Sequence, residues 1–264
     1  MDLFKQALAP IPREAWKEIN GRAEAVIKSV LSARKALRVI GPLGLENTAV
    51  STGRMHLLKN ETDQSVKSGL YENLSLMESR VDFELNRWEL DNILRGTRDV
   101  DFDQLDQAAL KLAEFEEKTI FYGHKEAKIP GLLAEAAQTI DLGSESQAIV
   151  EGIAQAVIKL EGGFAKKPFV LLVSPKLMMA LNKIHGAKIL REIIENIIGG
   201  KVILAKGLDG ALLMPSDHED LELRIGQDYT IGYQDHDSQS VHLFIMISFL
   251  PRVIDKNLLI RLKY

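Results

Sequence analysis

Histidine is the residue type in this sequence that is best suited to acid–base or metal chemistry, and its spacing decides whether several copies could act together. The six histidines lie at positions 56, 124, 185, 218, 236 and 242. No pair has the close spacing that places two imidazoles on one helix face, so a metal site would have to be assembled from distant residues. We expect surface or hydrogen-bonded histidines, and no metal centre.

Carboxylates gather in three short stretches. DHED at 217–220 and DHD at 235–237 each lie between candidate strands, where turns rich in aspartate are common, so we interpret them as turns rather than cation sites. In EFEEK at 114–118 the carboxylates stand beside lysines on a predicted helix, which favours a solvated face over an acid/base pair.

Motifs for nucleophilic or phosphate chemistry are absent from the sequence. There is no G-x-S-x-G elbow, no P-loop and no G-x-G-x-x-G, and the glycine pairs at 162–163 and 199–200 are typical of helix ends. The chain has no cysteine, which excludes disulfides, thiolate zinc sites, iron–sulfur clusters and cysteine nucleophiles. We therefore predict that the chain is not an enzyme.

Composition narrows the classes further. The 264 residues are 46% hydrophobic and 27% charged, as in ordinary globular proteins, and they are enough for a sizeable core. The net charge of -4 and the lack of a basic tail argue against nucleic-acid binding. No segment predicts a membrane span, and residues 1–16 lack the apolar run of a signal peptide, so we expect a cytoplasmic protein.

The first half of the chain predicts two long helices separated by a weakly patterned segment. Apolar residues recur at spacings of three and four from Arg13 to about Leu37, in a stripe wide enough to cover two surfaces. Residues 47–71 show only faint alternation and would need a neighbouring subunit to cover them. A strand around 81–85 and a helix over 104–122 follow.

Beyond Pro130 the pattern alternates between helix and strand. Helices are predicted around 147–160, 174–184 and 189–200, and a buried strand over 169–173. Strands follow at 201–205, 210–214 and 220–225, and the last forty residues are rich in β-strand patterns. Residues 131–222 therefore read as an inserted α/β domain, with the outer segments pairing across it.

Trp88 lies between the predicted strand and a short charged helix. The simpler interpretation is a core anchor that packs the strand-to-helix hinge beneath the weakly patterned segment. The alternative is an exposed stacking platform near a subunit junction for a flat cofactor such as a flavin.

Several stretches in the same order resemble one family. LAPIPREAWKEINGRAEAVIKSVLSARKAL, RWELDNILRG, AEFEEKTIFYG, IIGGKV and above all GQDYTIGYQDHDSQSVHLFIMISF are similar to the encapsulin shell proteins, also described as linocin-like bacteriocins. The likeness extends from residue 3 to Tyr264. It implies an α+β fold of the phage-capsid (HK97) type with a peripheral domain, an extended loop and an axial domain.

On this resemblance, the parts are assigned by position. Residues 1–46 are the peripheral domain with the N-terminal helix, 47–71 the extended loop, 72–130 the peripheral domain with the spine helix, 131–222 the axial domain, and 223–264 the closing strands. The implied function is a shell subunit that self-assembles into an icosahedral compartment around a ferritin-like or peroxidase-type cargo enzyme. The alternative is a protease or bacteriocin, against which the missing signal peptide and nucleophile motif count.

The resemblance also implies two sites. A pore on the five-fold axis corresponds to the loop Ile184, His185, Gly186, Ala187 and Lys188, whose charges would disfavour cations unless they point away from the opening. A C-terminal targeting peptide on the cargo would bind a groove of the inner wall, unless these side chains are ordinary core. The residues expected there are Ile27, Val30, Leu31, Arg34, Tyr229, Ile231 and Val253, and Arg34 could pair with a backbone carbonyl or carboxylate of the peptide. The shell itself requires no cofactor in this interpretation, and flavin at Trp88 remains the alternative.

Overall fold

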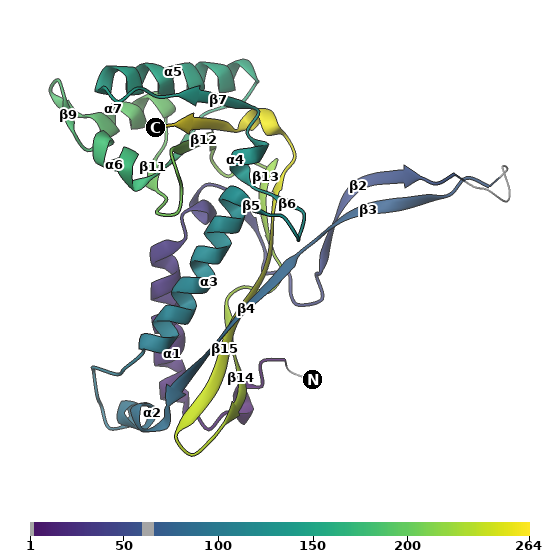
Figure 1. Cartoon of the computed structure of the whole chain (residues 1–264), viewed down its shortest axis with the longest axis vertical. Helices are drawn as coiled ribbons and strands as arrows, with labels where there is room; N and C mark the ends of the chain where they lie inside the picture. The colour runs from purple at the N-terminus through teal and green to yellow at the C-terminus, as the bar shows by residue number, and fades with distance from the viewer. Residues whose placement is uncertain (1–2, 60–65) are drawn as a thin grey trace.

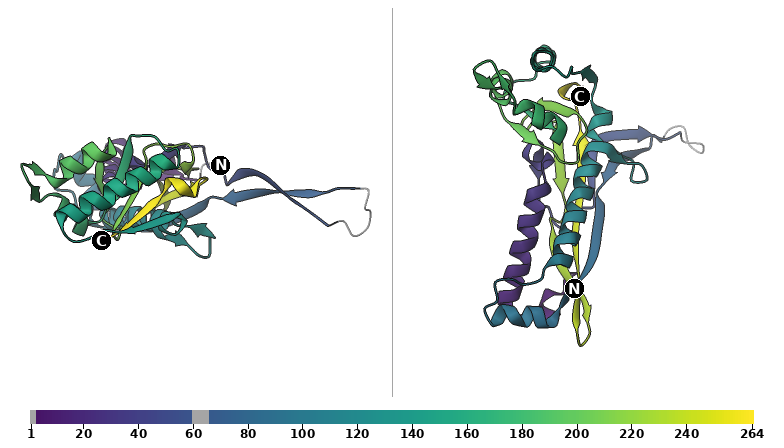
Figure 2. Two further views of the ribbon diagram at one scale, coloured as in Figure 1. Left: turned by 90° about the horizontal axis from the view of Figure 1, so that it is seen from above. Right: turned by 60° about the vertical axis from the view of Figure 1, so that its left-hand side comes forward.

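The computed structural model describes residues 3–59 and 66–264, and three parts can be distinguished in them (Figure 1). A long sheet backed by two long helices forms the lower body, and a smaller α/β domain lies at one end of it. A two-stranded arm projects far from the side of this body (Figures 1 and 2). The mixture of helices and sheets is the predicted α+β class, and one hydrophobic core extends through both the body and the α/β domain.

The long sheet is organised around β15 (Ser240–Val253), which is buried along most of its length. β14 (Thr230–His236) and β13 (Leu221–Ile225) pair antiparallel with successive parts of one edge of β15, and β4 (Met77–Asn86) pairs with the other edge. β1 (Arg38–Ile40) adds a short parallel strand beside β13. Segments from both ends of the chain therefore build one sheet.

Helices α1 (Arg13–Val30) and α3 (Asp103–Tyr122) pack against each other, and α3 packs on β4 and β15. The predicted helix over 104–122 is confirmed. Along α1 the buried residues follow the three- and four-residue spacing that gives a helix one apolar face; they are Ala15, Ile19, Ala23, Ile27 and Val30.

The prediction that the first helix continues to Leu37 is wrong. α1 ends at Val30, Leu31 is extended, and a short 3-10 turn, η2 (Ala33–Lys35), follows. The helix ends early because of a residue of α3: the Glu117 carboxylate accepts hydrogen bonds from the backbone N–H groups of Ser32 and Ala33. Backbone donors that bond a side chain of another helix cannot also continue their own helix.

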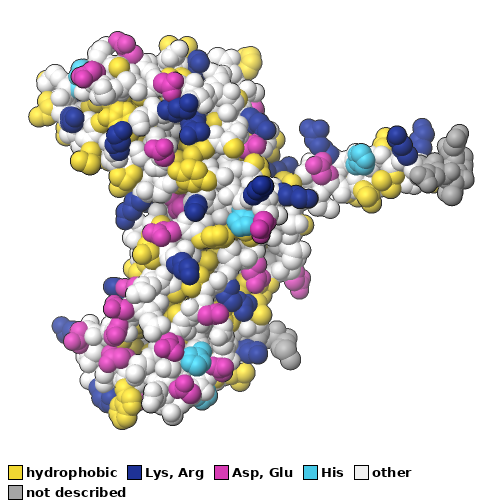
Figure 3. Space-filling model, viewed as in Figure 1, with side chains coloured by type: hydrophobic (Ala, Val, Ile, Leu, Met, Phe, Trp, Pro, Cys, Tyr) yellow, Lys and Arg dark blue, Asp and Glu magenta, His cyan; other side chains and the backbone are white. Residues whose placement is uncertain are grey.

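The arm is the antiparallel pair β2 (Ala49–Leu57) and β3 (Gly69–Ser75). Its second strand runs beyond the predicted end at residue 71, and residues 60–65 lie outside the described residues. Large apolar side chains on the described part are more than half exposed, and some of them are visible in Figure 3; they are Met55, Leu57, Leu70 and Tyr71. A two-stranded ribbon with so much exposed apolar surface is marginal by itself.

The α/β domain contains a five-stranded sheet in the order β11-β8-β12-β16-β7. Its strands are β7 (Gln138–Asp141), β8 (Phe169–Val173), β11 (Val202–Leu204), β12 (Ala211–Pro215) and β16 (Ile260–Lys263). Its main helices are α5 (Ser146–Gly162), α6 (Pro175–Leu181) and α7 (Leu190–Ile198). β16 is the last strand of the chain, so the C-terminus returns to complete the sheet of the inserted domain.

The remaining elements are short connectors. They are η1 (Gln6–Leu8), α2 (Arg87–Leu94), β5 (Gly123–His124), β6 (Ile129–Pro130), α4 (Leu132–Glu135), β9 (Ile184–His185), β10 (Lys188–Ile189) and η3 (Lys256–Leu258). Among them, β9 and β10 form a hairpin at the tip of the α/β domain farthest from the arm (Figure 1).

Candidate functional site

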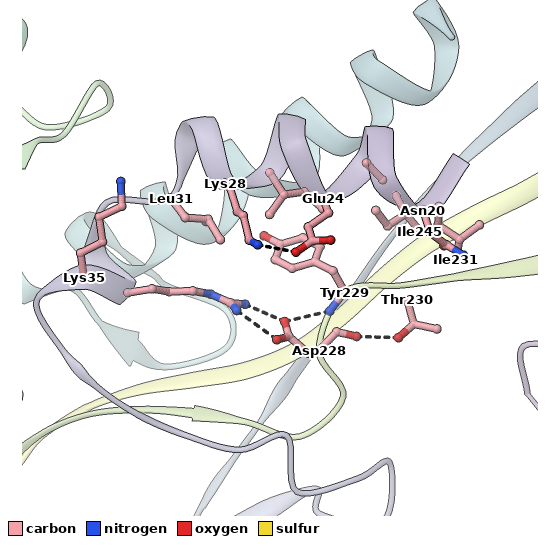
Figure 4. Close-up of a pocket in the computed structure, with 13 residues that line it drawn as sticks. Asn20, Glu24, Lys28, Leu31, Lys35, Asp228, Tyr229, Thr230, Ile231 and Ile245 are labelled. Atoms are coloured by element: carbon pink, nitrogen blue, oxygen red, sulfur yellow. Dashed lines mark hydrogen bonds and ion pairs between the residues drawn. The ribbon is translucent and has the colours of Figure 1, made fainter. Parts of the chain in front are cut away.

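A groove of about 920 Å³ lies between the C-terminal half of α1 and the first residues of β14. Figure 4 shows side chains from the helix, from the turn after it and from the sheet converging on this space. The lining residues are Asn20, Ala23, Glu24, Ile27, Lys28, Leu31, Arg34, Lys35, Asp228, Tyr229, Thr230, Ile231 and Ile245. We call this space the α1–β14 groove.

The floor of the groove is apolar and rigid. Ala23, Ile27 and Leu31 repeat every fourth residue, so they lie in one row along α1 and its cap. Opposite them, Ile231 of β14 and Ile245 of β15 are cross-strand partners and point to the same face of the sheet. All five side chains are buried in the core on one side and contribute to the groove on the other.

The rim of the groove is polar. Glu24 and Lys28 form an ion pair one helical turn apart, and both side chains are largely exposed. The Thr230 hydroxyl donates a hydrogen bond of 2.8 Å to the Asp228 carbonyl and accepts another of 2.8 Å from Gln227 Nε2. No ion-pair partner of Lys35 is found within residues 3–59 and 66–264. An apolar floor between polar edges suits an extended peptide with a few apolar side chains.

One end of the groove is closed by a charge network around Arg34, in which Glu116 is buried and Asp228 is partly exposed. The guanidinium donates from Nε and Nη2 to the two oxygens of Glu116, at 2.8 and 3.1 Å, and from Nη2 and Nη1 to those of Asp228, at 3.0 and 3.2 Å. Tyr229 donates its hydroxyl proton to Glu116 Oε2 at 2.6 Å, and Arg34 also lies 5.2 Å from the centre of the Tyr229 ring. These contacts join the turn after α1, the start of β14 and the middle of α3.

The prediction that the carboxylates of EFEEK form a solvated face is wrong for two of the three. The side chain of Glu116 is 0% exposed and Glu117 is 3% exposed, whereas Glu114 lies on the surface. Glu117 accepts from Ser32 N at 2.9 Å, from Ala33 N at 2.8 Å and from the Ser32 hydroxyl. Both buried carboxylates are fully hydrogen-bonded, which is the condition for burying charge at acceptable cost.

Protonation of this network follows from burial and pairing. Burial alone would lower the pKa of Arg34, but hydrogen bonding and charge pairing with Glu116, and then with Asp228, raise it above its ordinary value. Burial and then the negative charge of Glu116 raise the pKa of Tyr229, so its hydroxyl keeps its proton. Burial raises the pKa of Glu117, and the hydrogen bonds from Ser32 and Ala33 oppose that shift.

The structure brings together most of the residues predicted for a cargo groove. Ile27, Leu31, Arg34, Tyr229 and Ile231 line it. Val30 is buried and outside the lining, and Val253 pairs with Leu221 at the far end of β15, so neither of them lines this groove. The guanidinium of Arg34, which was expected to pair with a carbonyl or carboxylate of the peptide, is bound to two carboxylates of the chain itself.

Sequence reasoning missed the polar half of the groove. Asn20, Glu24, Lys28 and Lys35 share one face of the first helix and the turn after it with the apolar row, and that periodicity could have revealed them. Asp228 and Thr230 flank the predicted Tyr229. No sequence signal marks Glu116, whose partners are 82 and 113 positions away.

Trp88 is not the predicted core anchor. Its side chain is 67% exposed, it lies in the first turn of α2, and its ring centre is 5.7 Å from the guanidinium carbon of Arg95. The arm projects from another part of the subunit, so it does not cover this tryptophan (Figure 1). The helix begins here because the Asn86 side chain caps it by accepting a hydrogen bond from Trp88 N.

The predicted pore residues form the β9–β10 hairpin. Ile184 is 79% exposed, Gly186 has a φ of 63° that favours glycine in the tight turn, and His185 pairs with Lys188 across the hairpin. Ala187 and Lys188 are exposed as well. The hairpin therefore presents all five residues at the tip of the α/β domain.

The turn predicted for DHED is confirmed, whereas DHD lies mostly in the last residues of β14. Residues of DHED form a turn in which Asp217 has a φ of 52°, and Asp237 of DHD accepts from the Gln239 and Ser240 N–H groups in the β14–β15 turn. Asp235 is the second-last residue of β14 and pairs with His242. Within the part of the chain that the structure describes, no three histidine or acidic side chains are placed to share a metal ion. The same residues contain no helix that is long and apolar enough to cross a membrane.

The sequence of the chain is similar to those of known proteins. Residues 1–250 match the family described as "Encapsulating protein for peroxidase". The chain is 34% identical over 248 residues to the type 1 encapsulin shell protein of Mycolicibacterium paratuberculosis, and 33% identical to that of Mycobacterium tuberculosis, with 93% of each chain covered in both comparisons. It is 32% identical to that of Rhodospirillum rubrum over 96% of this chain and 93% of the relative.

Solved structures agree on the fold. The virus-like particle from Pyrococcus furiosus superimposes with a TM-score of 0.71 at 18% identity, covering 94% of this chain and 99% of that chain. The capsid of an empty GTA particle gives a TM-score of 0.59 at 15% identity, over 88% and 89% of the two chains. The predicted phage-capsid fold is therefore confirmed.

Proposed function

Because the chain belongs to the family of encapsulin shell proteins and is a shell subunit with the phage-capsid fold, we propose that its particle encloses a peroxidase-type or ferritin-like enzyme. The α1–β14 groove is the proposed docking site, and a C-terminal tail of the cargo is the proposed occupant. A peroxidase is the better supported cargo, since the matched family is described by one. Because shell and cargo must meet while the shell assembles, we further infer a cytoplasmic compartment.

The observation that carries this proposal is the apolar floor of the groove. Ile27, Leu31 and Ile231 remain part of a continuous opening, although they also belong to the hydrophobic core. An open row of aliphatic side chains is a surface that an extended peptide can cover through alternate residues. The same floor residues come from two elements that the core already holds in place, so little ordering is needed on binding.

Many copies of the groove and of the tail together can retain a cargo that a single groove would hold only weakly. A groove of this size contacts only a few side chains, so we expect weak binding of a single tail. A closed shell repeats the groove in every subunit, and a cargo oligomer repeats the tail. Each tail bound after the first is held at a high effective concentration, which raises retention without any new contact.

The test is to co-express the shell with a fluorescent protein that carries the C-terminal segment of a candidate peroxidase. We expect the fluorescence to co-elute with the particles, and to be lost when Ile27 is changed to aspartate without loss of particles. The proposal would be abandoned if the particles of this variant retain as much fluorescent protein as the parent.

We also propose that the β9–β10 hairpins meet at an opening of the shell. Lys188 and His185 would then repeat around the axis and create a positive potential in a narrow passage, which favours anions over cations. The exposure of Ile184 and Lys188 at the tip of the α/β domain supports this placement.

A flavin at Trp88 remains a second proposal. Its exposed indole offers a free ring face for stacking, and the neighbouring Arg95 could contact a phosphate of the cofactor. Adding flavin to purified shells should then quench tryptophan emission, more strongly in the parent than in Trp88→Leu. We propose no catalytic activity for the chain itself, in keeping with relatives that are named as shell proteins.

A further inference from the structure

The buried carboxylate of Glu116 acts on the groove without lining it. Its side chain is 0% exposed and is absent from the groove wall, yet it bonds to two residues that do form the wall, Arg34 and Tyr229. Those two residues come from different elements, the η2 turn and the segment before β14. One carboxylate on α3 thereby holds both sides of the closed end in one geometry.

Besides the geometry of the closed end, Glu116 also determines its charge. The hydrogen-bonded cluster at the closed end consists of one cation, Arg34, and two anions, Glu116 and Asp228, and carries a net charge of -1. Lys35 also lines the groove but is not part of this cluster. Every nitrogen of the Arg34 guanidinium already donates to one of these carboxylates. An incoming carboxylate would meet a cation in which four of the five N–H groups already donate and, beside it, the partly exposed Asp228.

We propose that Glu116 is a positioning residue that determines the charge selectivity of the α1–β14 groove: by holding Arg34 it makes the closed end reject a tail carboxylate and accept a neutral group. The inference rests on the proposed function of the groove as a tail-docking site. It gives Arg34 a different role from the one expected from the sequence, in which the arginine pairs with a carbonyl or carboxylate of the tail.

The proposal predicts how the groove changes when the negative charge of Glu116, which compensates the charge of Arg34, is removed. In Glu116→Gln the amide oxygen can still accept from Tyr229 and from Arg34 Nη2, which share one oxygen in the parent, whereas the amide nitrogen cannot accept from Arg34 Nε. The cluster changes from a net charge of -1 to neutral, and part of the Arg34 donor set becomes available. A charge-assisted hydrogen bond to a tail carboxylate then becomes accessible, which should shift preference toward an acidic tail by about tenfold.

The experiment uses two dye-labelled peptides in which leucine alternates with glycine. Both are amidated at the C-terminus, and they differ in one residue near it, aspartate in one and its neutral isostere asparagine in the other. Dissociated shells are reassembled in the presence of each peptide, and the affinity ratio of the two peptides is measured. The matched control is Glu114→Gln, the same substitution on the exposed face of the same helix.

In the parent and in the Glu114→Gln shells we expect the asparagine peptide to bind at least as well as the aspartate peptide. In Glu116→Gln shells the aspartate peptide should gain about tenfold relative to the asparagine peptide, and the added change Arg34→Gln should abolish that gain. A ratio that does not change in Glu116→Gln overturns the inference and leaves the groove assignment intact. Failure of both peptides to bind parent shells overturns the proposed groove itself.

A second variant covers the case in which Glu116→Gln does not assemble. Asp228 holds the same guanidinium from the partly exposed side, so Asp228→Asn relieves the charge with less risk to the core. The affinity ratio should move in the same direction. An unchanged ratio in Asp228→Asn shells of normal size would count against the inference as firmly as the first result.

Discussion

Shortening Ile231 to alanine tests whether the floor of the groove holds cargo. The side chain is 2% exposed, pairs across the sheet with Ile245 and faces the row of α1 residues. Replacing a buried isoleucine by alanine costs about 2 to 5 kcal/mol of unfolding free energy, according to how well the site can collapse. Because one side of this site already opens to the groove, we expect a cost near 2 kcal/mol.

The effect on tail binding follows from the carbons removed. Ile231→Ala deletes three carbon atoms, and burial contributes about 0.8 kcal/mol for each such group. Since the core takes roughly half of this surface, the tail loses about 1 kcal/mol, or roughly fivefold in affinity per tail. A cargo retained through two tails should then be held about 25-fold less tightly, because the losses multiply.

The matched control is Ile247→Ala. Ile247 is 0% exposed and lies two residues beyond Ile245 on the same face of β15, but it does not line the groove. The Ile247→Ala variant should lose at least as much unfolding free energy as Ile231→Ala, about 3 kcal/mol, but its shells should keep their cargo. The assay is the ratio of tail-fused fluorescent protein to shell after size exclusion, with denaturant unfolding of the subunits as the stability measurement. Equal loss of cargo in both variants, or full loading of Ile231→Ala, would refute the reasoning.

Four further outcomes are expected. Deleting Ser51 to Lys67, a segment that includes residues outside the described ones, should prevent normal particles in negative-stain images, because the arm exposes apolar side chains that only another subunit can cover; intact shells of normal size would contradict this. Lys188→Glu should speed cation entry to an enclosed enzyme while leaving particle diameter unchanged, and an uptake rate equal to that of the parent would dismiss the pore assignment. Burial raises the pKa of Glu117, so the stability linked to this group is present below its ordinary value of 4.5 and declines as pH rises through the raised pKa; denaturant unfolding of Glu117→Gln should lack that decline, and parallel curves would argue against it. The hydrogen bond from His242 to Asp235 raises the pKa of His242, so its contribution is present below 6.5 and is lost as pH rises; the melting temperature of the parent should exceed that of His242→Gln at low pH only, and a constant difference would show that protonation is not involved.

Several features of this protein could be predicted from local patterns in the sequence. The apolar period of α1 and α3 reflects a helix that buries one face, so both helices could be predicted. Because the chain has no cysteine, residue type alone excludes disulfides and thiolate chemistry. The wide stripe of the first helix also indicated that Ile27 and Leu31 face two environments at once, and they do.

Other features depend on contacts between residues far apart in the chain. α1 ends at Val30 because Glu117, some 85 positions away, binds the backbone of Ser32, and no local pattern around residue 30 contains that information. Arg34 is occupied rather than free because folding brings it to Glu116 and Asp228, 82 and 194 positions away. The sequence alone determined which surfaces are apolar, since that depends on residue type and period; the tertiary structure decided which charges are buried and compensated, since burial and pairing exist only once distant segments have met.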